Sequence, residues 1–166
     1  MRKYIYILFI FAIILASCKT NEEPQSSPRY AMSEMVVRHA DSTLPQDTLK
    51  VKMDEEDILI DSISVGDTVS FAILCSAVTN QLTAFTVTND TAVLAMRMIL
   101  NKNHTDALDA SSDVENCRLV FKRGYGAASI PMEYIARKSV TATFSFKLET
   151  TSEYSPATLT FKQPIR

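Results

Sequence analysis

The chain has 166 residues, with 17 Lys and Arg against 19 Asp and Glu, which gives a formal net charge of −2. This mild acidity argues against nucleic acid as a partner, because binding to phosphates requires a basic patch. The length excludes a large multidomain protein and suits one domain of ordinary size.

The N-terminus has the layout of an export signal. Two basic residues precede an apolar run, Tyr4–Leu15, and small residues then lead to Cys18. The run has about 12 residues, short of the roughly 20 that a membrane span needs. The tetrad Leu15-Ala16-Ser17-Cys18 resembles the cleavage site of bacterial lipoprotein signals. This resemblance implies that residues 1–17 are removed and that Cys18 is acylated as the first mature residue. An uncleaved anchor and an unlipidated secretory signal are the alternatives.

The lipoprotein resemblance also implies a location. Lys19 follows Cys18, whereas aspartate at this position often marks inner-membrane retention in the lipoprotein family. Glu22 and Glu23 resemble a surface-export signal of some Gram-negative lineages, or they belong to a solvated tether. We therefore expect a lipid-anchored protein of the outer membrane, on the cell surface rather than on the periplasmic face. The signal holds two basic residues and no acidic one, so the mature net charge is 15 − 19 = −4.

A tether is expected between the anchor and the domain. Residues 18–29 lack apolar side chains past the cysteine, and Pro24 and Pro28 prevent a regular helix. Residues 30–45 are ambiguous, because Met32 and Met35 suit either an amphipathic helical turn or a first edge strand. The expected organisation is a signal peptide over 1–17, a lipidated cysteine and tether over 18–45, and a β-sandwich domain over 46–166.

From residue 46 onward, apolar and polar residues alternate with a period of two, which is typical of half-buried strands. The clearest run is Val140–Leu148, and turn signals such as Gly66-Asp67 and Asn89-Asp90 separate the runs. The expected strands are 49–53, 58–65, 69–78, 82–88, 92–100 (which also suits a short helix), 117–122, 129–137, 140–148 and 157–161.

These strands predict an all-β fold. Each has one polar face and one apolar face, and two such sheets packed together form an antiparallel β-sandwich. The absence of βαβ alternation argues against a parallel sheet. The stretch from Gly66-Asp67-Thr68 to Asn89-Asp90 resembles the early strands of immunoglobulin-like domains in bacterial surface lipoproteins. The antibody pattern of two cysteines around a core tryptophan is absent, since the chain has no tryptophan.

Cys75 and Cys117 are the cysteines that remain after Cys18. Each lies in phase with the apolar residues of its strand, so both are expected to point into the core. An even count in an oxidising compartment allows a disulfide between them, and two buried free thiols are the alternative.

No catalytic motif is found, so the sequence predicts a protein that is not an enzyme and that needs no cofactor. His39 and His104 lie in separate regions, and both are expected to be solvated rather than to bind zinc. The acidic loop 101–116 lacks the spacing of a calcium loop, so no metal site is expected.

Arg123 and Tyr125 flank a glycine turn and are the predicted surface-contact residues. The sequence therefore predicts a lipid-anchored binding or assembly protein whose partners are the membrane and another envelope protein. A glycan-binding accessory lipoprotein of a polysaccharide-uptake system is the alternative.

Overall fold

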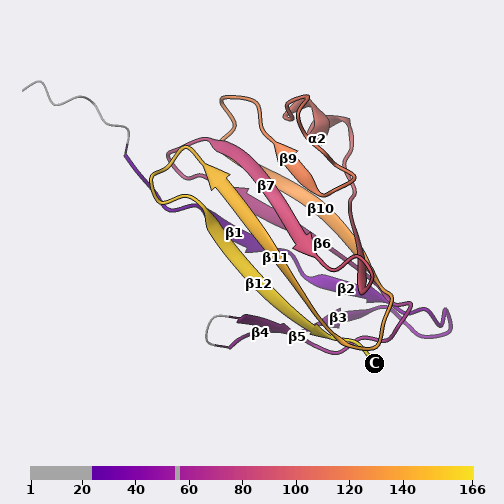
Figure 1. The fold of residues 1–166 in the computed structure, drawn as a ribbon. Coiled ribbons are helices and arrows are strands. Elements are labelled where there is room, and N and C mark those ends of the chain that lie inside the picture. The colour runs from indigo at the N-terminus through magenta and orange to yellow at the C-terminus, as the bar shows by residue number, and fades with distance from the viewer. Residues whose placement is uncertain (1–23, 55–56) are drawn as a thin grey trace, which may run out of the picture.

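A computed structural model describes residues 24–54 and 57–166, which form two packed β-sheets (Figure 1). The strands are β1 (Arg29–Met32), β2 (Met35–Arg38), β3 (Asp47–Leu49), β4 (Val51–Asp54), β5 (Asp57–Ile60), β6 (Thr68–Ser76), β7 (Leu82–Asn89), β8 (Leu94–Met98), β9 (Arg118–Val120), β10 (Ala127–Ala136), β11 (Thr141–Thr150) and β12 (Ala157–Pro164). A short helix, α2 (Lys102–Asp106), lies between β8 and β9.

The first sheet has the order β3-β2-β6-β10-β8, with β1 also paired to β6. The second sheet has the order β4-β5-β12-β11-β7-β9. The prediction of an all-β sandwich is confirmed. One feature differs from the expected antiparallel pattern, because β5 and β12 pair in parallel.

The core lies between the sheets and is built from the residues that alternate inward. On β11 the alternation is complete: Ala142, Phe144, Phe146 and Leu148 are all buried. The Phe144 ring stacks on Phe161 of the neighbouring strand with a centroid distance of 5.1 Å. Tyr134 of the first sheet packs against Phe144 at a centroid distance of 5.7 Å, so aromatic side chains also join the two sheets.

The domain begins earlier than the expected boundary at residue 46. Strands β1 and β2 lie inside the segment expected as tether, and both pair with β6. They share one edge of that strand, β1 along Ile73–Ser76 and β2 along Thr68–Ser70. The edge-strand alternative for residues 30–45 is therefore closer to the structure than the helical one, although β2 lies between β3 and β6.

The alternating run 49–53 also differs from expectation. It splits at Lys50, with β3 in the first sheet and β4 in the second. The chain thus crosses between sheets without losing its alternation, which is why the sequence predicts a single strand there.

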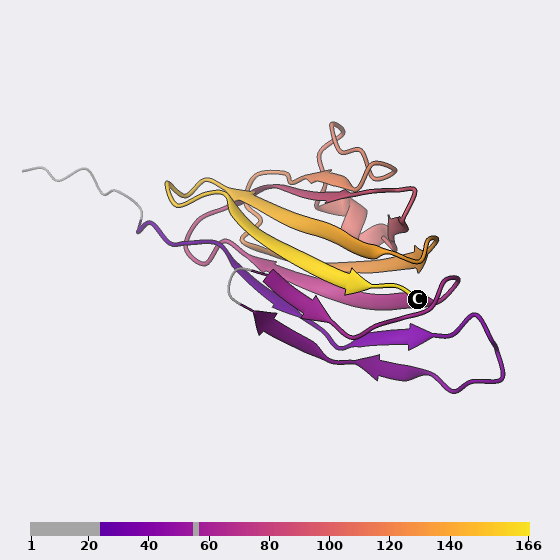
Figure 2. The ribbon, with the colours of Figure 1, turned by 60° about the horizontal axis from the view of Figure 1, so that its bottom comes forward.

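Two ends of the sandwich can be distinguished. The proximal end is the one where the described chain begins, and there residues 24–28 meet the turns 77–81 and 151–156. Thr79 Oγ1 donates to the Pro24 carbonyl, and the Ser26 amide donates to Asn80 Oδ1. The turn 122–126 lies beside the turn 77–81, since the Ala77 amide donates to the Gly126 carbonyl. The distal end holds the loops 39–46, 61–67 and 137–140. Figure 2 shows the loop between β2 and β3 reaching out at this end.

Candidate functional site

A helical turn forms in the segment that was expected to be a polar loop. The Asn101 side chain accepts a hydrogen bond from the His104 amide, while His104 Nδ1 accepts one from the Asn101 amide. These reciprocal bonds form a capping box, with histidine where glutamate or glutamine is usual. His104 is therefore a capping residue, and its Nδ1 is an acceptor rather than a metal ligand.

A pocket of about 170 Å³ lies between α2 and the start of β10. Strand β8 pairs with β10 only from Met132 onward, so no strand among the described residues covers Ala127–Ile130 on that side. The pocket has an apolar floor and a polar rim. The floor is formed by Leu100, Ala107, Leu108, Leu119, Phe121 and Ile130, and the rim carries Asn103, His104, Tyr125 and Ser129.

The two predicted contact residues lie in the β9–β10 turn but face different surroundings. Tyr125 lines the pocket, and its carbonyl accepts from the Leu82 amide at 2.7 Å. Arg123 is exposed and has no polar partner within the described part of the chain. Gly124 separates them with φ at +94°, a conformation that L side chains rarely adopt. The structure therefore brings Tyr125, but not Arg123, to the pocket.

A wider groove of about 540 Å³ adjoins this pocket across β10. Residues Ala127–Ser129 line both, and the far side of the groove is formed by Arg29–Ala31 and Leu74–Ser76. The Tyr30 hydroxyl donates to the Phe146 and Ala157 carbonyls of the second sheet. Burial raises the pKa of the Tyr30 phenol above its usual value, so the phenol stays neutral.

Cys75 and Cys117 are both buried and free, so the structure has two separate thiols and no disulfide between them. The two cysteines lie beside different parts of β10. Cys75 pairs with Ala128 of that strand, whereas Cys117 contacts the carbonyl of Met96, and Met96 pairs with Tyr134 of β10. Positions 128 and 134 are six residues apart on β10, about 20 Å at the rise of a strand. A disulfide requires Cα atoms roughly 4–7 Å apart.

Burial controls the acidity of both thiols. It raises the pKa of Cys75 to about 12. Burial, followed by the charge of Asp113, also raises the pKa of Cys117. Neither residue is therefore a reactive nucleophile at neutral pH.

His39 is not solvated as expected, because its Nδ1 lies 3.2 Å from Oδ2 of Asp67. Asp67 is buried and also accepts hydrogen bonds from the amides of Ser64 and Ala40. Burial alone would raise the pKa of Asp67, but these amides and His39 together hold it below its usual value. This carboxylate ties the loops 39–46 and 61–67 together at the distal end.

The acidic residues of the 101–116 segment close turns of their own chain. Asp109 accepts from the Ser111 amide and hydroxyl, and Asp113 accepts from Asn116. These bonds lower the pKa of both carboxyls. No group of side chains suited to a metal ion occurs among residues 24–54 and 57–166.

The predicted lipidation site, Cys18, lies outside the described residues. Within the described part of the chain, no helix is long and apolar enough to cross a membrane.

Comparisons with known proteins give no family. No family model matches the chain, and no curated protein matches it. Similar solved structures include the secreted serine protease VesC from Vibrio cholerae, at 7% identity and a TM-score of 0.41, with 70% of this chain and 23% of that one covered. A family 123 glycoside hydrolase from Clostridium perfringens has 7% identity and a TM-score of 0.44, and the match covers 84% of this chain and 27% of the hydrolase. The PapD-like domain 7 of human CEP192 has 8% identity and a TM-score of 0.36, and the match covers 89% of this chain and 92% of the CEP192 domain. The chain thus spans about a quarter of the length of the first two.

Proposed function

We propose that this protein is a non-enzymatic, lipid-anchored envelope protein that binds another protein through the pocket beside α2. The observation that supports this is the pocket itself, an apolar hollow with a polar rim at the place where β8 ends. Its volume of about 170 Å³ is below the roughly 300–1,000 Å³ of sites for small molecules. It suits a single apolar side chain, which is how a partner protein anchors its interface.

The anchor in this proposal is Cys18, acylated after removal of residues 1–17, and the location is the outer membrane with the domain on the cell surface. Mass spectrometry of the protein from membranes tests the first part: the N-terminal peptide should begin at an acylated Cys18, and Cys18→Ser should release the protein. Protease treatment of intact cells tests the second part. Protection of the domain until the outer membrane is opened would place it in the periplasm.

A photo-crosslinking residue at Asn103 tests the pocket. Asn103 is exposed on α2 and lines the pocket, whereas Gln46 is exposed at the distal end and serves as the control position. We expect a covalent adduct with a protein from position 103 and a much weaker one from position 46. Filling the pocket with Ala107→Leu should reduce the adduct. Equal labelling from both positions, or hydrolysis of a peptide or glycan by the pure domain, would contradict the proposal.

Glycan binding is the second candidate, favoured by one observation. Tyr125 lines the pocket together with Asn103 and Ser129, so an aromatic residue shares this surface with hydrogen-bonding groups. A glycan panel tests it: binding that is lost with Tyr125→Ala would support this candidate, and no binding across the panel would remove it.

A further inference from the structure

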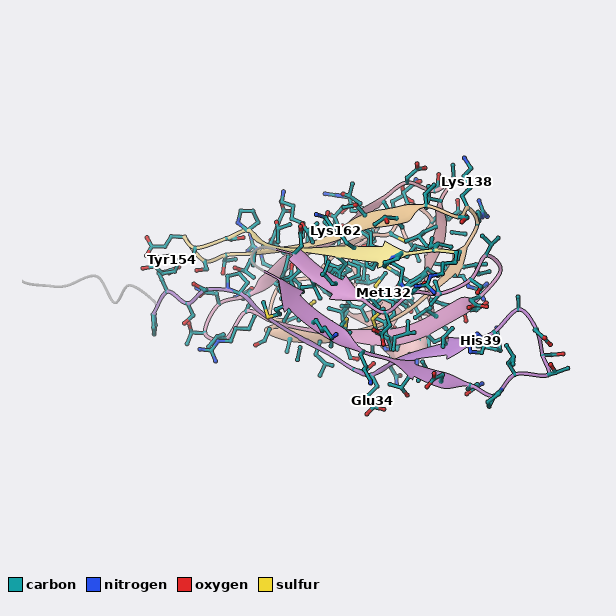
Figure 3. The ribbon with its side chains drawn as sticks, turned by 90° about the horizontal axis from the view of Figure 1, so that it is seen from below. Glu34, His39, Met132, Lys138, Tyr154 and Lys162 are labelled. Carbon is teal, nitrogen blue, oxygen red and sulfur yellow. The ribbon has the colours of Figure 1, made fainter. Side chains whose placement is uncertain are left out.

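The proximal end carries exposed apolar and aromatic side chains at the tips of two turns. Val78, in the β6–β7 turn, is 45% exposed, and Tyr154, in the β11–β12 turn, is 57% exposed. Figure 3 shows Tyr154 at the end of the molecule where the described chain begins, with His39 and Lys138 at the opposite end. Tyrosine is enriched at membrane–water interfaces, where its ring meets the apolar layer and its hydroxyl meets water.

These turns form one surface because hydrogen bonds through Gln81 hold them together. The Gln81 backbone exchanges bonds with Thr151, and its side chain accepts from the Gly124 amide at 3.0 Å. The incoming chain joins the same network, since the Glu153 amide donates to Oε1 of Gln25 at 3.0 Å. The turns and the N-terminal segment therefore present a fixed surface.

Val78 has a backbone conformation that is costly for its residue type. Its φ of +60° lies in the left-handed region, where a β-branched side chain is a genuine outlier. Glycine or asparagine would adopt this conformation more easily. An exposed valine at such a position indicates that its apolar side chain contacts another molecule rather than the core of the domain.

Among the described residues of the proximal turns and β1, basic side chains outnumber acidic ones. The basic residues at the proximal end are Arg29, Lys122 and Arg123, and the acidic residue in the described turns there is Glu153. Lys122 donates to the Asp106 carbonyl, whereas Arg29 and Arg123 have no polar partner within the described residues. Basic side chains near a membrane are attracted to anionic headgroups.

The anchor lies close to this surface in sequence. From Cys18 to Pro24 is six residues, which span at most about 20 Å even when fully extended. Strand β10 alone is ten residues long, about 33 Å. We propose that Val78, Tyr154 and Arg123 form a contact surface for the anionic headgroup layer of the membrane. This inference rests on the proposed acylation of Cys18 and adds that the domain stands on the bilayer with its distal end outward.

The test uses the mature chain, residues 18–166, coupled through the Cys18 thiol to a maleimide lipid in anionic nanodiscs. Because Cys75 and Cys117 are buried, coupling is directed to Cys18. A spin-labelled lipid then broadens the NMR signals of amides near the bilayer. We expect loss of intensity at residues 78–80, 124 and 152–154, and retained intensity at residues 40, 66 and 138. Val78→Asn with Tyr154→Ser, or Arg123→Ser, should reduce this difference between the ends.

The matched control is Leu44→Ser with Lys138→Ser at the distal end, which should leave the pattern unchanged. Equal broadening of both ends in the wild type, or a pattern that the proximal substitutions leave unchanged, would overturn the inference. The nanodisc experiment and the test of Cys18 acylation can fail independently, because chemical coupling of the lipid in vitro does not depend on processing of the protein in cells. An unacylated Cys18 in cells would refute the anchor and leave the nanodisc result readable.

Discussion

Asp67 is a buried carboxylate that joins two distal loops. It accepts from the amides of Ala40 and Ser64, each at 2.9 Å, and contacts His39. Replacing it with alanine removes the acceptor of these part-buried hydrogen bonds, and a hydrogen bond to a charged group contributes about 1.5–3 kcal/mol. We expect Asp67→Ala to lower the free energy of unfolding by at least that amount in urea titrations. Asp90→Asn, at an exposed turn, is the control and should have little effect.

The same residue gives a pH-dependent prediction. The folded-state pKa of Asp67 is lowered, so its ionised form stabilises the fold above the unfolded value of about 3.9. This stabilisation is lost as pH falls through the folded-state pKa. In Asp67→Asn the side chain cannot ionise, so the stability difference from the wild type should be largest at neutral pH and should shrink below about pH 4. A difference that stays constant through the acid range would contradict this assignment.

The two core thiols give a second prediction at this scale. Burial raises the pKa of Cys75 to about 12 and also raises that of Cys117, and the thiolate is the reactive form. In a Cys18→Ser variant we expect no reaction with a thiol reagent in the native state and reaction of both cysteines in denaturant. Mobility on non-reducing gels should match that on reducing gels. A reductant-dependent shift of the monomer band would show the disulfide that the structure lacks.

Two glycine turns allow the effects of backbone strain and steric contact to be separated. Gly66 and Gly124 have nearly equal φ values, +92° and +94°. A Cβ at Gly66 would lie 2.9 Å from Cβ of Ala40, whereas one at Gly124 has nothing within 4 Å. Both alanine variants carry the strain of a left-handed residue, about 1–2 kcal/mol. We expect Gly66→Ala to be the more destabilising in thermal unfolding, and equal losses would show that the contact with Ala40 relaxes freely.

Sequence alternation predicts the long strands but not the short ones. The ten-residue β11 has one continuous inward face, so its period of two is clear. Strands β1 and β2 have four residues each, and the break between them gives Met32 and Met35 a helical spacing. Their partner is β6, at least thirty residues further on, and a pattern within a short segment cannot show this pairing.

The candidate site was predictable only in part. Tyr125 stands out because it follows a turn glycine, but the pocket beside it is assembled from residues 100–108, 119–121 and 125–130. Long-range strand pairing brings these segments together, so no local motif marks the pocket. The signal for α2 was present but weak, since Asn101 is a good N-cap and the usual glutamate or glutamine at the third helical position is replaced by His104.

At the scale of the whole molecule, residues 29–38, which lie within the segment expected to be a tether, include two strands of the first sheet. Strands β1 and β2 cover the β6 edge that faces away from β10. Without them β6 would become an open edge strand. In the proposed lipid-anchored protein, fewer residues therefore separate Cys18 from the folded domain than the sequence pattern predicts.

Truncation tests this role of the N-terminal strands. A chain beginning at residue 46 loses Met35 and Val37, each 1% exposed, and each contributes about 1.5–3 kcal/mol by burial. The sum, about 3–6 kcal/mol, is comparable with the total stability of a small domain, about 5–15 kcal/mol, and the loss of the β6 pairing adds to it. We therefore expect residues 46–166 to lack cooperative thermal unfolding by circular dichroism, whereas residues 24–166 retain it. Removal of residues 24–27 alone is the control; it breaks only exposed or part-buried hydrogen bonds and should cost less than removal of the two strands. Cooperative unfolding of the 46–166 chain near the wild-type temperature would show that the domain begins where the sequence pattern predicts.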